Sequence, residues 1–229
     1  MLRLLSVVFS FTCLIPISNA DEPRQSRWEN AIVAFEKADR ESTPAAGPVV
    51  FTGSSSIRRW PLDQFFPTTR TLNRGFGGSQ MSDLIAFADR IVTPFQPSAI
   101  VVYSGDNDIA AGRSPERVRN DFLTFVGKVQ SDGQPTIVLI GVKPSERRWN
   151  LRKKLIETNR LLSEACENEE SLTFIDVYGL MLGEDGRPDP ELYAADKLHL
   201  SDKGYQKWQA LVATALDRFG IETAGETTP

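Results

Sequence analysis

The sequence contains one histidine, His199, and two cysteines, of which only Cys166 lies beyond the first twenty residues. Histidine is the side chain most often used as a general base near neutral pH, so acid–base chemistry of that kind would have to use His199. A single remaining cysteine cannot form a disulfide within the mature chain. Because Cys166 lies in an apolar pattern of helical spacing, we expect it to be a small core residue rather than a nucleophile.

An excess of positive charge is also absent. The formal net charge is −4 at pH 7, so no global basic surface indicates nucleic-acid binding. The sequence has no internal repeat and no low-complexity segment, and we expect no membrane span in the mature chain. A hydrophobic content of 41% and a charged content of 24% are typical of a globular protein with a substantial core.

The N-terminus has the three parts of a secretory signal peptide. Met1-Leu2-Arg3 is short and positive, residues 4–17 are mostly apolar, and Ser18-Asn19-Ala20 places small residues before a cleavage site. The apolar run is shorter than the roughly 20 residues that a membrane-spanning helix needs, although an uncleaved anchor is the alternative. We expect residues 1–20 to be removed near Ala20, and the mature protein to be secreted or periplasmic.

Short apolar runs alternate with amphipathic helical patterns along the rest of the chain. The runs of strand length cover 49–52, 71–75, 99–103, 136–142 and 172–177. The helical patterns cover 24–41, 82–91, 114–129, 149–166 and 201–219, with Ser82 and Ser114 as expected N-caps. This alternation predicts a three-layer α/β/α architecture, a flavodoxin-like, doubly wound five-stranded parallel sheet with an added N-terminal helix. We expect residues 21–229 to form a single domain with its core at about 49–219.

Polar or glycine-rich segments follow four of the predicted strands, where ligands of open α/β sheets bind. They are Gly53-Ser54-Ser55-Ser56, Gly75-Phe76-Gly77-Gly78-Ser79, Gly105-Asp106-Asn107-Asp108 and Asp196-Lys197-Leu198-His199. A serine hydroxyl becomes a good nucleophile beside a base, glycine N–H groups and an asparagine amide can bind an oxyanion, and a carboxylate can orient an imidazole. Together these groups are the parts that acyl transfer requires.

Each segment also has a plainer interpretation when it is taken alone. The serines suit a helix N-cap, the glycines suit a flexible turn, and His199 suits an exposed helix start. The glycine segment lacks the G-x-G-x-x-G spacing of a dinucleotide loop. The acidic segment is similar to the start of a calcium loop, but Arg117 stands where an EF-hand requires glutamate. Only the placement of all four segments at one sheet edge favours catalysis.

The four segments resemble the sequence blocks of the SGNH hydrolases, also called GDSL-type esterases and lipases. Gly53-Ser54-Ser55, with Ile57 and Trp60, is similar to the first block. Residues 73–78 are similar to the second block of the platelet-activating-factor acetylhydrolase-like branch, and residues 105–108 and 196–199 are similar to the third and fifth blocks. The resemblance spans residues 49 to about 215. Ser54 stands where the family usually has aspartate. This difference affects the expected geometry of the turn, and it makes Ser54 and Ser56 rival nucleophiles.

The resemblance implies a role for each site residue. Ser55 aligns with the nucleophile, His199 with the base and Asp196 with the carboxylate that orients it. The Gly78 N–H, the Asn107 side chain and the Ser55 N–H align with the oxyanion hole. No metal or cofactor is implied. The implied activity is that of a secreted serine esterase acting on carboxylic esters.

The sequence says less about the substrate. No long apolar lid is present, which favours short acyl chains, and an exported esterase would meet an acetylated carbohydrate or a lysophospholipid. Arg147 or Arg148 could contact a carboxylate or phosphate, although a solvated helix start is the interpretation we favour for both. The alternative to an esterase is a catalytically inactive flavodoxin-like or glycan-binding module.

Overall fold

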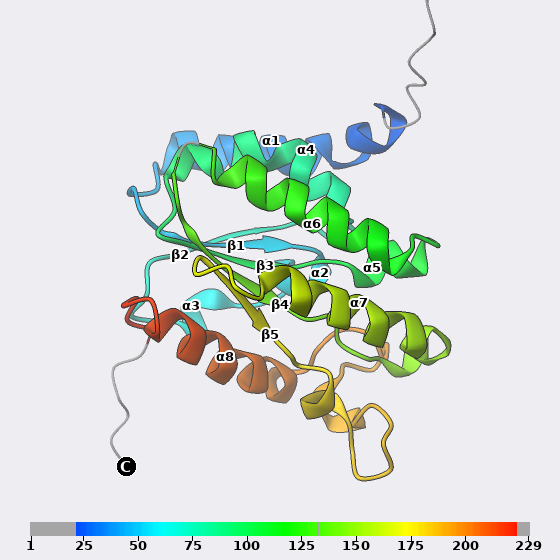
Figure 1. Ribbon diagram of the computed structural model, residues 1–229. Helices are drawn as coiled ribbons and strands as arrows, with labels where there is room; N and C mark the ends of the chain where they lie inside the picture. Colours follow the sequence, from blue (N-terminus) through cyan, green and yellow to red (C-terminus); the bar gives the residue numbers. More distant parts are fainter. Residues whose placement is uncertain (1–21, 132, 224–229) are drawn as a thin grey trace, which may run out of the picture.

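A five-stranded parallel sheet, in the order β2-β1-β3-β4-β5, forms the centre of the computed structural model, which describes residues 22–131 and 133–223 (Figure 1). The strands are β1 (Val49–Gly53), β2 (Thr71–Gly75), β3 (Ala99–Tyr103), β4 (Thr136–Ile140) and β5 (Leu172–Ile175). The order and the helices on both faces confirm the predicted doubly wound α/β fold. The expected signal peptide lies outside the described residues.

Helices cover both faces of the sheet. One face carries α1 (Glu22–Glu41), α4 (Met81–Ile91), α6 (Pro115–Val129) and α7 (Arg152–Cys166), and the other carries α2 (Ser55–Arg58), α3 (Leu62–Phe65) and α8 (Asp202–Asp217). The short helix α5 (Asp106–Ala110) follows β3, and 3-10 turns occupy Thr93–Phe95, Glu146–Leu151, Gly179–Met181 and Pro190–Leu192. Helix α1 packs on α4 as the predicted N-terminal addition (Figure 1).

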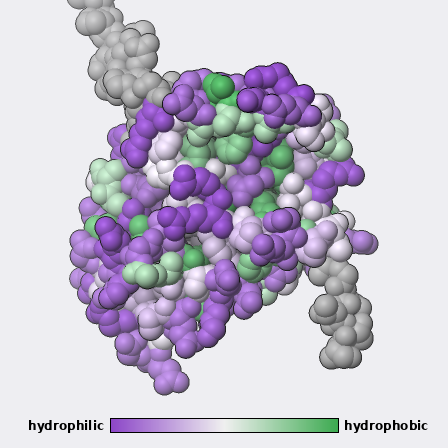
Figure 2. Space-filling model, turned by 180° about the vertical axis from the view of Figure 1, so that it is seen from behind, coloured by the Kyte–Doolittle hydropathy of each residue, from purple (hydrophilic) through white to green (hydrophobic). Residues whose placement is uncertain are grey.

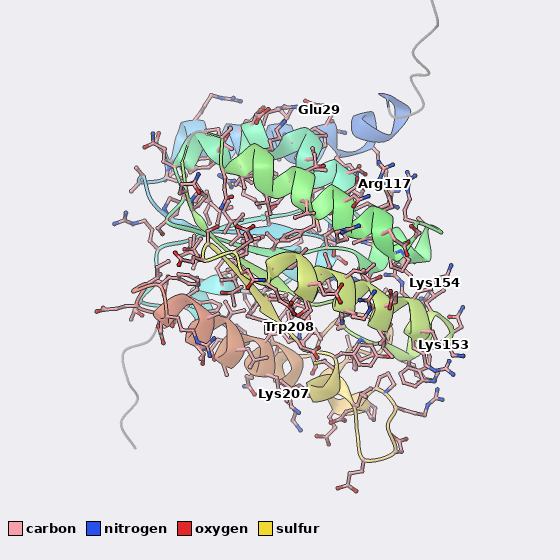
Figure 3. All side chains as sticks on the ribbon, viewed as in Figure 1. Glu29, Arg117, Lys153, Lys154, Lys207 and Trp208 are labelled. Atoms are coloured by element: carbon pink, nitrogen blue, oxygen red, sulfur yellow. The ribbon has the colours of Figure 1, made fainter. Side chains whose placement is uncertain are left out.

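The strands are buried because both faces of the sheet are covered. Every residue of β1 and β3 is buried, as their continuous apolar composition predicts. The helices bury one side only. In α8, Trp208 packs towards the sheet and Lys207 lies on the outer side (Figure 3). Cys166 is a buried free cysteine, which confirms its expected core position.

Two strands end earlier than predicted, because side chains take over their backbone hydrogen bonds. After β4, the Asn159 side chain accepts from Val142 N (2.7 Å) and donates to Val142 O (2.9 Å), which removes Val142 from the ladder. After β5, the Asp176 carboxylate accepts from Tyr178 N at 2.8 Å and turns the chain.

Helix starts agree with the sequence at one predicted cap and differ at another. The Ser114 hydroxyl accepts from Arg117 N at 3.3 Å, ahead of Pro115 at the first helical position, as predicted. The prediction of Ser82 as an N-cap is wrong, since α4 begins at Met81 and is capped at Gln80. The helix predicted from residue 149 begins only at residue 152, after a 3-10 turn in which Arg148 departs from helical backbone angles.

The surface is mostly hydrophilic on the face shown in Figure 2, where hydrophobic side chains form small separate groups. In the described part of the chain, no helix combines the length and apolar character that a membrane crossing would need.

The carboxyl ends of β1 and of its two neighbours, β2 and β3, lie side by side, and this edge holds the predicted site segments. Gly53 pairs in register with Gly75 on one side and with Tyr103 on the other. Gly53 has a φ of +143°, and a Cβ atom there would lie 2.1 Å from the Tyr103 carbonyl oxygen. Only glycine fits this contact, so the turn from β1 into α2 depends on it.

Candidate active site

Ser55 is the first residue of α2, directly beyond the end of β1. The preceding backbone N–H, that of Ser54, donates to the Tyr103 carbonyl at 3.1 Å and ties the turn to β3. The neighbouring serines are almost fully buried, with 1% exposure for Ser54 and 2% for Ser56, whereas Ser55 is partly exposed. Of the three serines, the middle one is therefore presented at the surface of the site.

Helix α2 has only one turn, so its orientation depends on contacts with other elements. The Asn73 side chain in β2 donates to the Ile57 carbonyl at 2.8 Å. From the opposite side, the Tyr205 hydroxyl in α8 donates to the Ser56 carbonyl at 2.8 Å. The Tyr205 bond reaches a carbonyl near the end of the short helix, and the Ile57 carbonyl also accepts from Trp60 N at 3.0 Å. Neither Asn73 nor Tyr205 was assigned a role from sequence.

His199 lies against Ser55, although the two residues are 144 positions apart in sequence. Its Nε2 atom is 2.8 Å from Ser55 Oγ, and its Nδ1 atom is 2.5 Å from Asp196 Oδ2. An ionised carboxylate can only accept, so Nδ1 must donate its hydrogen to Asp196. In the neutral imidazole, Nε2 then accepts from the Ser55 hydroxyl, which is the arrangement of a general base.

A compact loop holds Asp196 beside the imidazole. Its Oδ1 atom accepts from Leu198 N at 3.0 Å and from His199 N at 2.9 Å, while Oδ2 faces the imidazole. Lys197 adopts a left-handed conformation with a φ of +58°, which is uncommon for a residue other than glycine. This conformation folds the loop back so that one carboxylate reaches three donors.

The environment of Asp196 keeps its carboxylate ionised. Burial raises the pKa of Asp196, but hydrogen bonds from the His199 side chain and from the His199 and Leu198 N–H groups outweigh burial and hold the pKa well below its usual range. Arg59 Nη1 lies 3.8 Å from Asp196 Oδ2, but both side chains are substantially exposed, so this pair contributes little.

Asn107 lies in the short helix α5 after β3, and Gly78 lies in the loop after β2, at the same edge of the sheet. The Asn107 Nδ2 atom donates to the Ser79 carbonyl at 3.0 Å, which joins α5 to the loop after β2. Gly78 has a φ of +80°, and a Cβ atom there would lie 3.3 Å from the Trp28 ring of α1. Within the described part of the chain, the backbone N–H groups of Gly78 and Ser55 have no hydrogen-bond acceptor, so they are available to a ligand.

A single carbonyl at the end of β1 holds the loop after β2. Gly53 O accepts from Phe76 N at 2.9 Å and from the Ser79 hydroxyl at 3.2 Å. The segment that carries Gly78 is therefore fixed to the strand that carries Ser55. The structure thus brings Ser55, Asp196 and His199 into direct contact, and it places Gly78 and Asn107 at the same edge of the sheet.

Arg148 also lies at this edge, and it is not solvated as we expected for both arginines of the segment. Its Nη2 atom donates to Asn107 Oδ1 at 2.9 Å, and its Nη1 atom lies 2.8 Å from Asp106 Oδ2. Arg147, the preceding residue, is exposed. The expectation was wrong for Arg148 because two adjacent arginines are indistinguishable in sequence until the fold decides which one faces the buried carboxylate.

Two further charged side chains are buried behind the site. Lys143 Nζ lies 3.9 Å from Asp106 Oδ2, and burial lowers the pKa of Lys143. Asp108 accepts from Met81 N at the start of α4 (3.1 Å). Burial raises the pKa of Asp108 to about 7.

A cavity of about 250 Å³ adjoins the loop that carries the imidazole. Its lining residues come from the segments around 146 and 185–197, and they include Glu146, Arg187, Tyr193 and Lys197. Within the described residues, no group of three or more His, Cys, Asp or Glu side chains is arranged to hold a metal ion.

A hydroxyl, an imidazole and a carboxylate, each in contact with the next at the carboxyl edge of a parallel sheet, form the arrangement typical of hydrolases that use a serine nucleophile. Residues 45–207 match the model of the GDSL-like Lipase/Acylhydrolase family. The chain belongs to this family of carboxylic ester hydrolases, which confirms the resemblance drawn from its sequence blocks. No curated protein matches the sequence.

Solved structures of low sequence identity share the fold. A protein from Streptococcus pneumonia assigned as a platelet activating factor has a TM-score of 0.72 at 21% identity, over 86% of this chain and 95% of that chain. A GDSL-like lipase from Bacteroides thetaiotaomicron has a TM-score of 0.68 at 19% identity, over 85% of this chain and 97% of that chain. A variant of an acetyl xylan esterase from Geobacillus stearothermophilus has a TM-score of 0.57 at 16% identity, over 80% of this chain and 98% of that chain.

The raised pKa of Asp108 predicts a pH-dependent contribution to stability. Its folded-state pKa of about 7 exceeds the value of about 3.9 for an unfolded chain, so the native state retains a proton that the unfolded state loses. The stability from this proton is fully present below pH 4 and is lost as the pH rises through 7. The free energy of unfolding of the wild type, relative to Asp108→Asn, should fall by on the order of 2–4 kcal/mol from pH 4.5 to pH 8.

Urea unfolding at a series of pH values measures this difference. Asp89→Asn is the control, since Asp89 is an exposed carboxylate beside Lys128. The difference in the free energy of unfolding between the wild type and Asp89→Asn should stay nearly constant with pH. A constant difference for Asp108→Asn as well would contradict the raised pKa of Asp108 in the folded protein.

Proposed function

We propose that the protein is a serine esterase in which Ser55, His199 and Asp196 carry out the chemistry. The contact between Ser55 Oγ and His199 Nε2, at 2.8 Å, is the observation that carries this proposal. Asp196 supports it, because an ionised carboxylate fixes the tautomer and stabilises the imidazolium that forms when the imidazole accepts a proton.

The reaction proceeds through an acyl-enzyme. Ser55 Oγ attacks the ester carbonyl carbon while its proton passes to His199 Nε2. The bond from that carbon to the alcohol oxygen then breaks, and the alcohol leaves with the proton from the imidazolium. Water next attacks the acyl-enzyme and gives a proton to His199, which returns it to Ser55 Oγ as the acid departs.

The oxyanion of each tetrahedral intermediate is bound by three donors in this proposal. They are the N–H groups of Ser55 and Gly78 and the side-chain amide of Asn107. The two backbone groups are free of other acceptors in the described chain, and the amide is fixed by its bond to the Ser79 carbonyl. Fixed donors of this kind lower the barrier because they do not reorganise as charge develops.

We infer that the preferred substrates are esters of short acyl groups on a polar alcohol, such as an acetylated carbohydrate. The cavity beside the catalytic loop is small, about 250 Å³, and charged side chains from Glu146, Arg187 and Lys197 contribute to its lining. Such a lining suits hydroxyl groups better than the long chain of a lysophospholipid. An acetyl xylan esterase is among the proteins with the same fold.

A series of p-nitrophenyl esters from acetate to laurate tests the acyl preference. The ratio kcat/KM should not rise between butyrate and laurate, because chain that extends beyond a small pocket adds little transition-state binding. Release of fatty acid from a lysophospholipid faster than release of acetate from acetylated xylan would contradict the substrate class and leave the catalytic residues unaffected.

We further propose that the chain is exported. The charge, apolar run and small residues of the first twenty positions support this proposal. In a bacterial host expressing the full chain, the protein recovered from the periplasm or medium should begin at Asp21, as measured by N-terminal sequencing. Recovery of the chain only from the cytoplasm, still beginning at Met1, would contradict export.

Covalent labelling tests the nucleophile directly. A fluorophosphonate probe should label the wild type at Ser55, and Ser55→Ala should lose labelling and lower kcat for p-nitrophenyl acetate by several orders of magnitude. Ser56→Ala is the matched control and should be labelled like the wild type, because the Tyr205 bond uses the backbone of Ser56. Near-full activity of Ser55→Ala would refute the assignment. Absence of turnover and labelling in the wild type would favour a binding module.

A further inference from the structure

We propose that Arg148 is a positioning residue for ester hydrolysis, which holds the Asn107 side chain in the orientation that directs an N–H group at the substrate carbonyl oxygen. The inference rests on the proposed function, since it assigns a partner to one of the oxyanion donors. It is carried by the contact from Arg148 Nη2 to Asn107 Oδ1, at 2.9 Å.

An asparagine amide has two nearly identical orientations, and only one of them can serve an oxyanion. A guanidinium can only donate, so the atom facing Arg148 has to be the amide oxygen. A carbonyl can only accept, so the atom facing Ser79 O at 3.0 Å has to be the amide nitrogen. Rotation of the amide by half a turn would create two repulsive contacts in place of two hydrogen bonds. The nitrogen therefore stays at the site, with its second hydrogen left for the substrate.

Arg148 can orient the amide because it is itself held in place. Its Nη1 atom lies 2.8 Å from Asp106 Oδ2, and the Asp106 side chain is only 8% exposed. Lys143, which is buried, approaches the same oxygen at 3.9 Å. The backbone of Arg148 leaves the helical region inside a 3-10 turn, with a φ of −121°, and this departure distinguishes it from its helical neighbours.

The charges of this group also favour an anionic intermediate. The Asp106 carboxylate lies 2.8 Å from Arg148 Nη1 and 3.9 Å from Lys143 Nζ, so its negative charge is compensated behind Asn107. The guanidinium on the amide oxygen polarises the Asn107 amide and makes its N–H a stronger donor, an effect that acts on the transition state more strongly than on the neutral ester and that requires Asn107. Loss of Arg148 should therefore lower kcat more than it changes KM.

A purely structural ion pair is the competing interpretation, and a double-mutant cycle separates the two. Turnover of p-nitrophenyl acetate is measured for the wild type, Arg148→Met, Asn107→Ala and the double variant, with folding checked by thermal unfolding. Asn107→Ala should lower kcat by about 10²–10³-fold, and Arg148→Met by about 10–10²-fold with KM nearly unchanged. In the Asn107→Ala background, Arg148→Met should change kcat by less than about threefold, because the group it positions is already absent.

Controls keep the inference falsifiable. Arg147→Met, at the adjacent exposed arginine, should change kcat by less than about twofold in both backgrounds. Arg148→Lys retains a charge for Asp106 but lacks the fork that reaches both partners, so it should recover only part of the lost kcat. If Arg148→Met does not fold, Arg148→Lys takes its place in the cycle. Arg148→Lys should then lower kcat by less than the loss expected for Arg148→Met, and only when Asn107 is present.

The outcomes distinguish this inference from the proposed function. Equal losses of kcat with and without Asn107, or an effect on KM alone, would overturn the positioning role while Ser55-dependent turnover still supports the esterase. A wild type without turnover would overturn both.

Discussion

The parallel register of β1 with its two neighbours, β2 and β3, is the constraint on which the site depends. Gly53, Gly75 and Tyr103 lie at one level across the sheet, so the segments that follow them begin at the same edge. Parallel strands have to be joined by crossovers, which return the chain to the amino edge of the sheet, so that each strand ends at the same carboxyl edge. Residues from distant parts of the sequence can thereby meet without a long structured loop. The contact between Ser55 and His199, across 144 positions, is a consequence of this register.

Hydrogen bonds to backbone carbonyls at the strand ends tie the segments of the site together. The Gly53 carbonyl binds the segment that carries Gly78, and the Tyr103 carbonyl binds the turn that carries Ser55. The second interaction requires a close approach, which the absence of a Cβ atom at Gly53 allows. Fixed loops are important for an oxyanion site, since donors that had to move into place would lose much of their electrostatic effect.

Much of the fold could be predicted from sequence, because buried parallel strands and amphipathic helices have strong local signals. The ends of β4 and β5 could not, because the Asn159 and Asp176 side chains that end them act through contacts or turns that composition does not reveal. At the site, the candidate residues were found because each lies in a short block with recognisable chemistry. The role of their supports was not visible, because Asn73, Tyr205 and Arg148 act through tertiary contacts.

Three aspartates at this edge show how the environment, rather than residue type, determines function. Asp196 accepts three hydrogen bonds and stays ionised beside the imidazole. Asp106 is ionically paired with Arg148 and lies near Lys143, so its charge is balanced within the protein. Asp108 is buried and capped by the Met81 N–H, and burial brings its pKa to about 7.

The different environments of the three aspartates leave uncompensated negative charge only where the proposed chemistry benefits from it. An ionised carboxylate beside His199 stabilises the imidazolium, whereas an uncompensated carboxylate behind Asn107 would oppose the oxyanion. The nearest carboxylate to Asn107 in sequence on one side is neutralised by cations, and the one on the other side is driven towards its neutral form by burial. The electrostatics of the loop after β3 therefore agree with the role proposed for its asparagine, independently of the family to which the chain belongs.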